Sequence, residues 1–160
     1  MILLRRFDVA RLQADLAVID ANSFLSHGHV GWKVVPLRSR GGRSDEVQPA
    51  DVGAPFRDTP ILKKTPYFRE VIAALEPVGS VRLSSIEPGG EIKSHEDTGI
   101  LIDKIHVSIV TNPGCKMIFR HEEFHWAEGE AWRANFKIPH AAVNRGLTRR
   151  VHMLICPGGD

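Results

Sequence analysis

The stretch Lys104-Ile105-His106-Val107-Ser108-Ile109-Val110-Thr111 alternates polar and apolar residues, and it decides the fold class. Because successive side chains on a β-strand point to opposite faces, Lys104, His106 and Ser108 share one face and the apolar residues between them share the other. The polar face lies in water if this is an ordinary amphipathic strand, which the pattern alone favours. It points inward if the strand is part of a barrel whose interior is polar.

Similar runs surround this stretch. From Gly79 onward, short segments rich in β-branched residues are separated by turns that contain Gly, Pro or Asn. The predicted strands are Val81–Ile86, Glu91–His95, Lys104–Thr111, Lys116–Phe119, Glu130–Phe136 and Thr148–Cys156. Strands this short and regular predict an antiparallel barrel or sandwich.

The part of the chain before Gly79 has a different pattern. Asp8 to Ala21 has an N-cap at Asp8 and apolar residues at helical spacing. A second helix, with Thr65 as its N-cap, is predicted from Pro66 to Leu75. Gly31 to Arg38 is predicted to be a short strand, which its proline places at a sheet edge. Ser39 to Pro60 is rich in glycine, proline and charge, and we expect this long loop to act as a lid over a site.

Length and cysteine usage bound the architecture. A chain of 160 residues can bury roughly two thirds of its unfolded surface, which is enough for one hydrophobic core that needs no stabilising disulfide bond or structural metal ion. Cys115 and Cys156 form no C-x-x-C pattern, so we expect reduced thiols. We predict a single domain, residues 1–160, that is mainly β (α+β), with a helical and loop part (1–78) packed on a β core (79–157).

The charge balance and hydropathy exclude some partners. With 21 Lys plus Arg against 19 Asp plus Glu, the net charge of +2 is too small to suggest a nucleic-acid surface. No apolar stretch approaches the roughly 18 residues of a membrane span, so we expect no membrane partner. Met1 to Leu4 followed by two arginines lacks the order of a secretory signal, and we expect a cytoplasmic location.

A possible metal site is found in Ser94-His95-Glu96-Asp97, where His95 and Asp97 project to the same side of a strand. His140 follows another predicted strand and offers a third ligand. Two imidazoles and one carboxylate leave three octahedral positions open, as in non-haem Fe(II) oxygenases, whereas a structural site would be closed. By itself an H-x-D pattern is weak evidence, because a surface histidine beside a solvated acid gives the same pattern.

Arg150 strengthens the interpretation of a site. It lies ten residues after His140, on a predicted strand whose same face also presents His152 and Leu154. An arginine inside a barrel needs an anion, and its planar fork suits a carboxylate. If the polar face of Lys104–Thr111 lines the interior, Lys104 and His106 become further anion contacts, and Ser84 adds a hydroxyl.

In this order, the residues resemble the aspartyl/asparaginyl β-hydroxylases and the related bacterial proline hydroxylases, which depend on Fe(II) and 2-oxoglutarate. The likeness extends from about Val81 to Ile155. The matching motifs are Ser84 before Glu87-Pro88-Gly89, His95-Glu96-Asp97, Gly129-Glu130-Ala131-Trp132, Pro139-His140 with Asn144, and Arg150-Val151. Lys104-Ile105-His106 departs from the family's Arg-x-His, and Asn135 stands where an aspartate is usual.

The resemblance implies a double-stranded β-helix (jelly-roll, cupin-like) oxygenase core. His95, Asp97 and His140 would hold Fe(II), and 2-oxoglutarate and dioxygen would take the open positions. The far carboxylate of 2-oxoglutarate would pair with Arg150, assisted by Ser84, with His106 and Lys104 as further cosubstrate contacts.

The family implies a hydroxylase, and the chain's size points to its substrate. We expect an amino acid or a peptide-like small molecule, because 160 residues leave no room for an appended recognition domain. Hydroxylation of Asp or Asn side chains in a protein is the alternative. The oligomeric state is not predicted.

Other classes of protein compete with this interpretation. A non-enzymatic cupin-like binding module would keep the barrel but would not need an arginine to bind a ligand carboxylate, so Arg150 argues against this alternative. A metal-dependent isomerase, or a dioxygenase without 2-oxoglutarate, could share the three ligands. His121-Glu122-Glu123-Phe124-His125 is a literal H-E-x-x-H zinc-protease motif, but that motif works only on a helix. A polar hairpin between two strands is the preferred interpretation of this segment.

Overall fold

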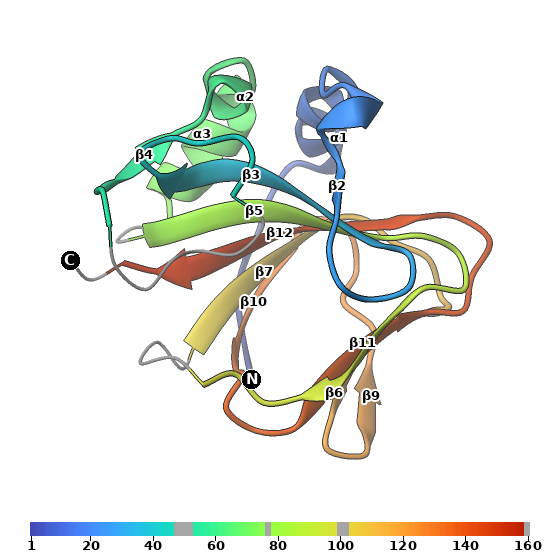
Figure 1. Cartoon of the computed structure of the whole chain (residues 1–160). Coiled ribbons are helices and arrows are strands. Elements are labelled where there is room, and N and C mark those ends of the chain that lie inside the picture. Colours follow the sequence, from blue (N-terminus) through green and yellow to red (C-terminus); the bar gives the residue numbers. More distant parts are fainter. Residues whose placement is uncertain (47–52, 76–77, 99–102, 159–160) are drawn as a thin grey trace.

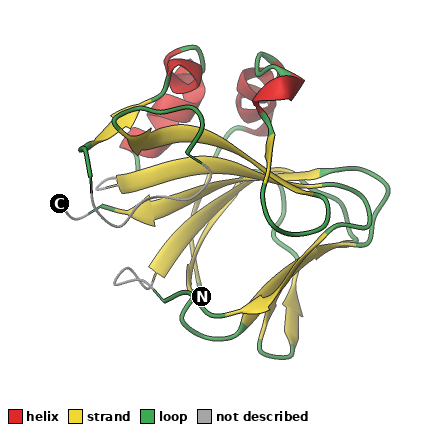
Figure 2. Cartoon of the chain, viewed as in Figure 1, coloured by secondary structure: helices red, strands yellow, loops and turns green. Residues whose placement is uncertain are grey.

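The computed structural model of the chain describes residues 1–46, 53–75, 78–98 and 103–158. In these ranges the chain forms two antiparallel β-sheets and a small group of helices (Figures 1 and 2). None of the described helices is long and apolar enough to cross a membrane.

The strand order defines the core. In the order of pairing, the larger sheet contains β1 (Ile2–Arg6), β10 (Glu130–Asn135), β7 (Asp103–Val110), β12 (Arg150–Pro157), β5 (Val78–Ile86), β3 (Trp32–Arg40) and β2 (Leu25–Ser26), and β4 (Phe56–Asp58) also pairs with β3. The smaller sheet contains β6 (Glu91–His95), β11 (His140–Asn144), β8 (Cys115–Phe119) and β9 (Glu122–Phe124). From β5 onward the chain alternates between the two sheets, except at the β8–β9 hairpin. This is the topology of a double-stranded β-helix, and it confirms the predicted jelly-roll, cupin-like fold.

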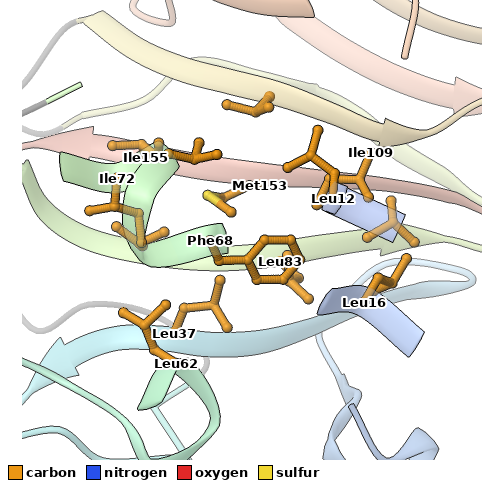
Figure 3. Packing of buried hydrophobic residues seen from close by; sticks show 14 of the residues in the cluster. Leu12, Leu16, Leu37, Leu62, Phe68, Ile72, Leu83, Ile109, Met153 and Ile155 are labelled. Atoms are coloured by element: carbon orange, nitrogen blue, oxygen red, sulfur yellow. The ribbon is translucent and has the colours of Figure 1, made fainter. Parts of the chain in front are cut away.

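The helices form a third layer on the larger sheet. Figure 1 shows α1 (Val9–Ala17), α2 (Pro60–Lys63) and α3 (Pro66–Ala73) on one side of this sheet, with the smaller sheet on its other side. Buried residues from the helices and from the outer face of the sheet make one hydrophobic cluster, in which Phe68 packs near Leu83 and Met153 (Figure 3). A second cluster, which includes Trp32, Met117 and Phe136, fills part of the space between the two sheets.

Strand β7 shows which side of the larger sheet is polar. Its residues Ile105, Val107 and Ile109 belong to the cluster beneath the helices. His106 and Ser108, on the opposite face, are also buried, because the smaller sheet covers them. The polar face therefore lines the space between the sheets, and the expectation that it lies in water is wrong. Alternation alone cannot distinguish these cases, because only the tertiary fold decides what covers a strand.

Strand β3 is not at the sheet edge, contrary to the expectation from Pro36. It pairs with β5 on one side and with β2 and β4 on the other. Pro36 lies between the residues that pair with β2 and those that pair with β4, so its missing N–H interrupts neither ladder there. The carbonyl of Pro36 accepts a hydrogen bond from the Thr59 hydroxyl at 3.0 Å. The proline is accommodated by a gap in the outer pairing.

Two helices begin as the sequence indicates, but by different means. The Asp8 side chain accepts a hydrogen bond from Arg11 N at 3.0 Å and caps α1, which ends at Ala17 rather than continuing to Ala21. Thr65 precedes α3 but does not cap it, because its hydroxyl bonds to carbonyls of the preceding turn. Instead Asp15 of α1 accepts a hydrogen bond from Phe68 N at 2.8 Å. A residue of one helix thus satisfies the first turn of the other.

Several elements were not expected from the sequence. They are β1, β2, β4, β9, β11 and the short helix α2. The N-terminal part therefore contributes strands to the larger sheet in addition to its helices. Of the segment predicted to be a lid, residues 47–52 lie outside the described part of the chain, and its end forms β4.

Candidate active site

A pocket with about 460 Å³ of empty space, part of it open to solvent, lies between the two sheets. All seven residues singled out in the sequence line it: Ser84, His95, Asp97, Lys104, His106, His140 and Arg150. They come from distant parts of the chain, since Ser84 and Arg150 are 66 residues apart in the sequence. The fold thus brings together the residues that sequence patterns had only placed on separate strands.

His95, Asp97 and His140 form a cluster that can hold a metal ion. Their candidate ligand atoms all lie within 4.8 Å of one another. His95 ends β6 and His140 begins β11, and the two are paired directly in the antiparallel ladder. Asp97 is held beside them because its backbone N–H donates to Phe136 O at 3.0 Å. The pairing of two strand ends therefore creates this cluster.

Hydrogen bonds orient both imidazoles for metal binding. His95 Nδ1 lies 2.8 Å from Lys93 O, and His140 Nδ1 lies 3.0 Å from Ile138 O. Since a carbonyl can only accept, both Nδ1 atoms carry the hydrogen, and both Nε2 atoms keep a lone pair for a metal. Burial lowers the pKa of His140 below its usual value, which favours the neutral form that a metal requires.

Asp97 is shared between the histidines and a lysine. Its Oδ1 lies 3.7 Å from His95 Nε2, and its Oδ2 accepts a hydrogen bond from Lys104 Nζ at 2.5 Å. One carboxylate oxygen therefore faces the imidazoles while the other is held by an ammonium group. Lys104 was expected to contact the cosubstrate, and in this structure its ammonium contacts Asp97.

Arg150 is a buried cation, only 1% exposed. Burial lowers its pKa to about 10. Its Nη2 contacts Met117 Sδ at 3.1 Å and a nitrogen of His152, but no carboxylate among the residues that the structure describes pairs with it. A buried charge without a counter-ion is costly, so the geometry favours an anionic ligand at this position.

His106 and Ser84 lie on the same wall as Arg150. The ring of His106 stacks on Phe136 with 5.1 Å between centroids, and neither of its nitrogens has a hydrogen-bond partner among the described residues. The pKa of His106 is held well below its usual value, mainly by burial and secondly by the charge of Arg150, so the imidazole is neutral. Ser84 Oγ accepts from Trp32 Nε1 at 2.9 Å, which leaves the hydroxyl hydrogen for another acceptor.

The pocket also contains residues that the sequence interpretation did not assign to it. They are Trp32, Arg82, Ile92, Met117, Phe136, Ala141, Ala142 and Leu154. Arg82 could have been found, because it lies two residues before Ser84 on one strand and therefore shares its face. Trp32 both packs in the core and lines the pocket. Nothing in the local sequence marks Met117.

The H-E-x-x-H motif does not form a metal site. Its residues Glu122 to Phe124 form strand β9 of the β8–β9 hairpin, so the two histidines are not placed on one helical face. Among the described residues, His95, Asp97 and His140 are the only cluster that could hold a metal ion. The zinc-protease alternative is therefore wrong. The segment is part of a hairpin, but it contributes a strand of its own that pairs with β8, and it is not simply the connection between two predicted strands.

Comparison with known proteins agrees with this geometry. A family model described as "Aspartyl/Asparaginyl beta-hydroxylase" matches residues 7–156. The L-proline cis-4-hydroxylase of Rhizobium meliloti (strain 1021) is 30% identical over 160 residues, which cover 94% of this chain and 57% of that protein. The chain thus spans little more than half the length of this relative.

A solved structure supports the fold independently. The crystal structure of an oxidoreductase of the 2OG-Fe(II) oxygenase family from Burkholderia pseudomallei superposes with a TM-score of 0.62 at 10% sequence identity. The superposition covers 92% of this chain and 76% of that one. Because the family model extends over almost the whole chain, the protein belongs to the aspartyl/asparaginyl β-hydroxylase family.

Proposed function

We propose that the protein is an Fe(II)- and 2-oxoglutarate-dependent hydroxylase that acts on an amino acid or a peptide-like small molecule. The observation that carries the proposal is the combination, in one pocket, of a two-histidine, one-carboxylate cluster and a buried arginine with no carboxylate partner among the described residues. Either feature alone would fit several functions. Together they fit a metal site with an adjacent binding site for an anionic cosubstrate.

The donor set fits Fe(II). Two imidazole nitrogens and one carboxylate oxygen are the protein ligands that non-haem Fe(II) oxygenases use, and they leave coordination positions for other ligands. The orienting hydrogen bonds of His95 and His140 would keep both Nε2 atoms available without rearrangement. When bound, Fe(II) with 2-oxoglutarate and dioxygen supplies the oxidising power for hydroxylation of a C–H bond.

The larger sheet would bind the cosubstrate. Arg150 offers a buried guanidinium to the far carboxylate of 2-oxoglutarate, and burial strengthens such a charge-assisted pair. Ser84 can donate its hydroxyl hydrogen, since its oxygen already accepts from Trp32. His106, buried and neutral, has nitrogens available to a bound ligand. Apolar lining residues, among them Phe136 and Leu154, help to exclude water from the reaction.

The proposed substrate is a small molecule. The relative from Rhizobium meliloti is named for its action on L-proline, which makes free L-proline the first compound to test. A non-enzymatic cupin-like module would have no need for the buried charge of Arg150. Hydroxylation of a protein side chain is the other outcome to be tested.

A substrate screen tests the proposal. The protein would be incubated with Fe(II), 2-oxoglutarate and a panel of L-amino acids and short peptides, including L-proline and peptides that contain Asp and Asn. We expect mass spectrometry to detect a product that gains one oxygen atom, with an equal amount of succinate, and only when both Fe(II) and 2-oxoglutarate are present. A chelator should abolish both signals. Metal binding without succinate or oxygenated product from any compound would favour the binding module instead.

A further inference from the structure

His152 is a buried residue to which neither the metal cluster nor the expected cosubstrate contacts assign a role. It lies two residues after Arg150 on β12, so both side chains point from the same face of the strand. In the sheet, His152 is paired with Ser84 of β5 on one side and with Ser108 of β7 on the other. Only 2% of its surface is exposed.

The ring of His152 connects Arg150 to a chain of hydrogen bonds. Arg150 Nη2 lies 2.7 Å from His152 Nδ1, and Arg150 Nε lies 3.2 Å from His152 Nε2. On the far side, His152 Nε2 lies 3.1 Å from Ser108 Oγ. Ser108 Oγ in turn donates to the backbone oxygen of Trp126 at 3.2 Å.

Elementary hydrogen-bond chemistry and the two distances set the direction of this chain. A guanidinium can only donate, and a neutral imidazole has one nitrogen that can accept. The contact of Arg150 Nη2 with His152 Nδ1 (2.7 Å) is shorter than that of Arg150 Nε with His152 Nε2 (3.2 Å), so Nδ1 is the acceptor and carries no hydrogen. The ring hydrogen is then on Nε2 and is donated to Ser108 Oγ, whose own hydrogen is used on the Trp126 carbonyl. This relay gives a partner to Arg150 Nη2, to both ring nitrogens and to the Ser108 hydroxyl, whereas the longer contact of Arg150 Nε with His152 Nε2 cannot be a hydrogen bond, because both nitrogens then carry a hydrogen. The relay requires a neutral imidazole. The pKa of His152 is held well below its usual value, mainly by burial and secondly by the positive charge of Arg150.

We propose that His152 is a positioning residue that fixes the guanidinium of Arg150 for binding of the cosubstrate carboxylate. Its contact, with that of Met117 Sδ, holds the Nη2 side of the guanidinium, while Nη1 has no hydrogen-bond partner among the described residues. A long side chain that is already held in one orientation loses less entropy when it binds its ligand. The inference rests on the proposed role of Arg150 as the cosubstrate arginine.

Two substitutions at His152 separate positioning from simple packing. His152→Leu fills similar space but cannot accept from Arg150, whereas His152→Gln offers an oxygen to Arg150 and an N–H to Ser108. Binding of 2-oxoglutarate would be measured by titration calorimetry on protein loaded with Mn(II), which needs no turnover. We expect His152→Leu to weaken 2-oxoglutarate binding about tenfold, the effect of losing one hydrogen bond to a charged group, and His152→Gln to stay within about threefold of wild type. Mn(II) affinity should be unchanged in both variants.

The alternatives give different results. Equal losses in the leucine and glutamine variants, an unchanged 2-oxoglutarate affinity in His152→Leu, or a parallel loss of Mn(II) affinity would each overturn the inference. If the wild-type protein binds Mn(II) but not 2-oxoglutarate, the proposed function fails, and the inference fails with it.

A second measurement keeps the inference testable if His152→Leu does not fold. In wild-type protein with ¹⁵N-labelled histidine, NMR should show His152 as the neutral form with hydrogen on Nε2. Ser108→Ala removes the acceptor of that hydrogen and the bond to the Trp126 carbonyl but keeps His152 and Arg150. It should change the Nε2 signal and weaken 2-oxoglutarate binding by a smaller factor than His152→Leu. A hydrogen on Nδ1 in the wild-type protein would contradict the relay, because Nδ1 could not then accept from Arg150.

Discussion

His95 and His140 face each other across the β6–β11 pair, and their ring centroids lie 4.2 Å apart. Each donates its Nδ1 hydrogen to the carbonyl oxygen of the residue two positions earlier in the chain, Lys93 and Ile138 respectively. The same local hydrogen bond on two paired strands therefore leaves both Nε2 atoms available beside Asp97. The cluster is oriented before any metal arrives, which reduces the reorganisation that binding requires.

Removal of one ligand should abolish metal binding. Loss of an outer contact of a metal ligand typically costs about 10- to 100-fold in affinity, and loss of the ligand itself should cost more. We therefore expect His140→Ala to weaken Mn(II) or Co(II) binding by more than about 100-fold in calorimetry. His121→Ala is the matched control, because His121 is an exposed histidine next to β9 and should leave the affinity unchanged. Similar losses in both variants would show that the metal is not held by this cluster.

Arg150 should be required for cosubstrate binding but unfavourable for stability. In Arg150→Met a buried cation without a carboxylate partner among the described residues becomes apolar, so thermal unfolding of the ligand-free protein should shift to higher temperature. Binding of 2-oxoglutarate should weaken on the order of 100-fold, because a buried charge pair is lost. Metal affinity should not change. An Arg150→Met variant that unfolds at a lower temperature and still binds 2-oxoglutarate would contradict both the predicted gain in stability and the predicted loss of binding.

The buried histidines predict how stability depends on pH. Burial holds the folded-state pKa of His106 and His152 well below the value of 6.5 expected in the unfolded chain. Below that value the unfolded state binds protons that the folded state does not. Their contribution to stability is therefore fully present above about pH 6.5 and declines as the pH falls towards the folded-state pKa values, by up to about 1.4 kcal/mol per pH unit for each histidine.

A substitution can isolate the contribution of one of these histidines. His152→Gln removes one titrating group, so its free energy of unfolding should fall less than that of the wild type between about pH 7 and about pH 5.5. Urea unfolding at several pH values in this range would measure the difference. Parallel curves for the two proteins would mean that His152 is not a buried neutral histidine in the folded state.

The contact between α1 and α3 should be important for stability. Asp15 is buried and accepts the backbone N–H of Phe68, so Asp15→Ala leaves a buried donor without a partner. We expect the free energy of unfolding to fall by about 1–2 kcal/mol. Asp20→Ala is a suitable control, because the exposed Asp20 makes the same type of bond to Asn22 N and water can replace it. Equal effects in chemical denaturation would argue against the burial of the Asp15 contact.

Local patterns predicted much of this fold. Polar and apolar alternation gave most strands of the core, and β6 begins and ends where it was predicted. Strand β11 was not predicted, because Ala141 and Ala142 have low strand propensity and its stability comes from pairing with β6 and β8 on either side. The cap of α3 was also not predicted, since the residue that provides it, Asp15, is remote in sequence.

The site was predicted less completely, for a related reason. Spacing along single strands placed His95 with Asp97 and Arg150 with His152 on shared faces. It could not show that Lys104 contacts Asp97, or that Arg150 is buried against Met117, because those contacts cross between separate strands. Periodicity gives the face of a strand, and only the packing of the two sheets decides which groups meet across the pocket.

The most direct test of the proposed hydroxylase is succinate formation from 2-oxoglutarate in three matched proteins. In the presence of Fe(II), dioxygen and the substrate found in the screen, we expect the wild type and His121→Ala to form succinate and hydroxylated product in equal amounts. We expect His95→Ala to form neither. Succinate formation that persists in His95→Ala, or that is lost in His121→Ala alone, would contradict the assignment of His95, Asp97 and His140 as the iron site of an Fe(II)- and 2-oxoglutarate-dependent hydroxylase.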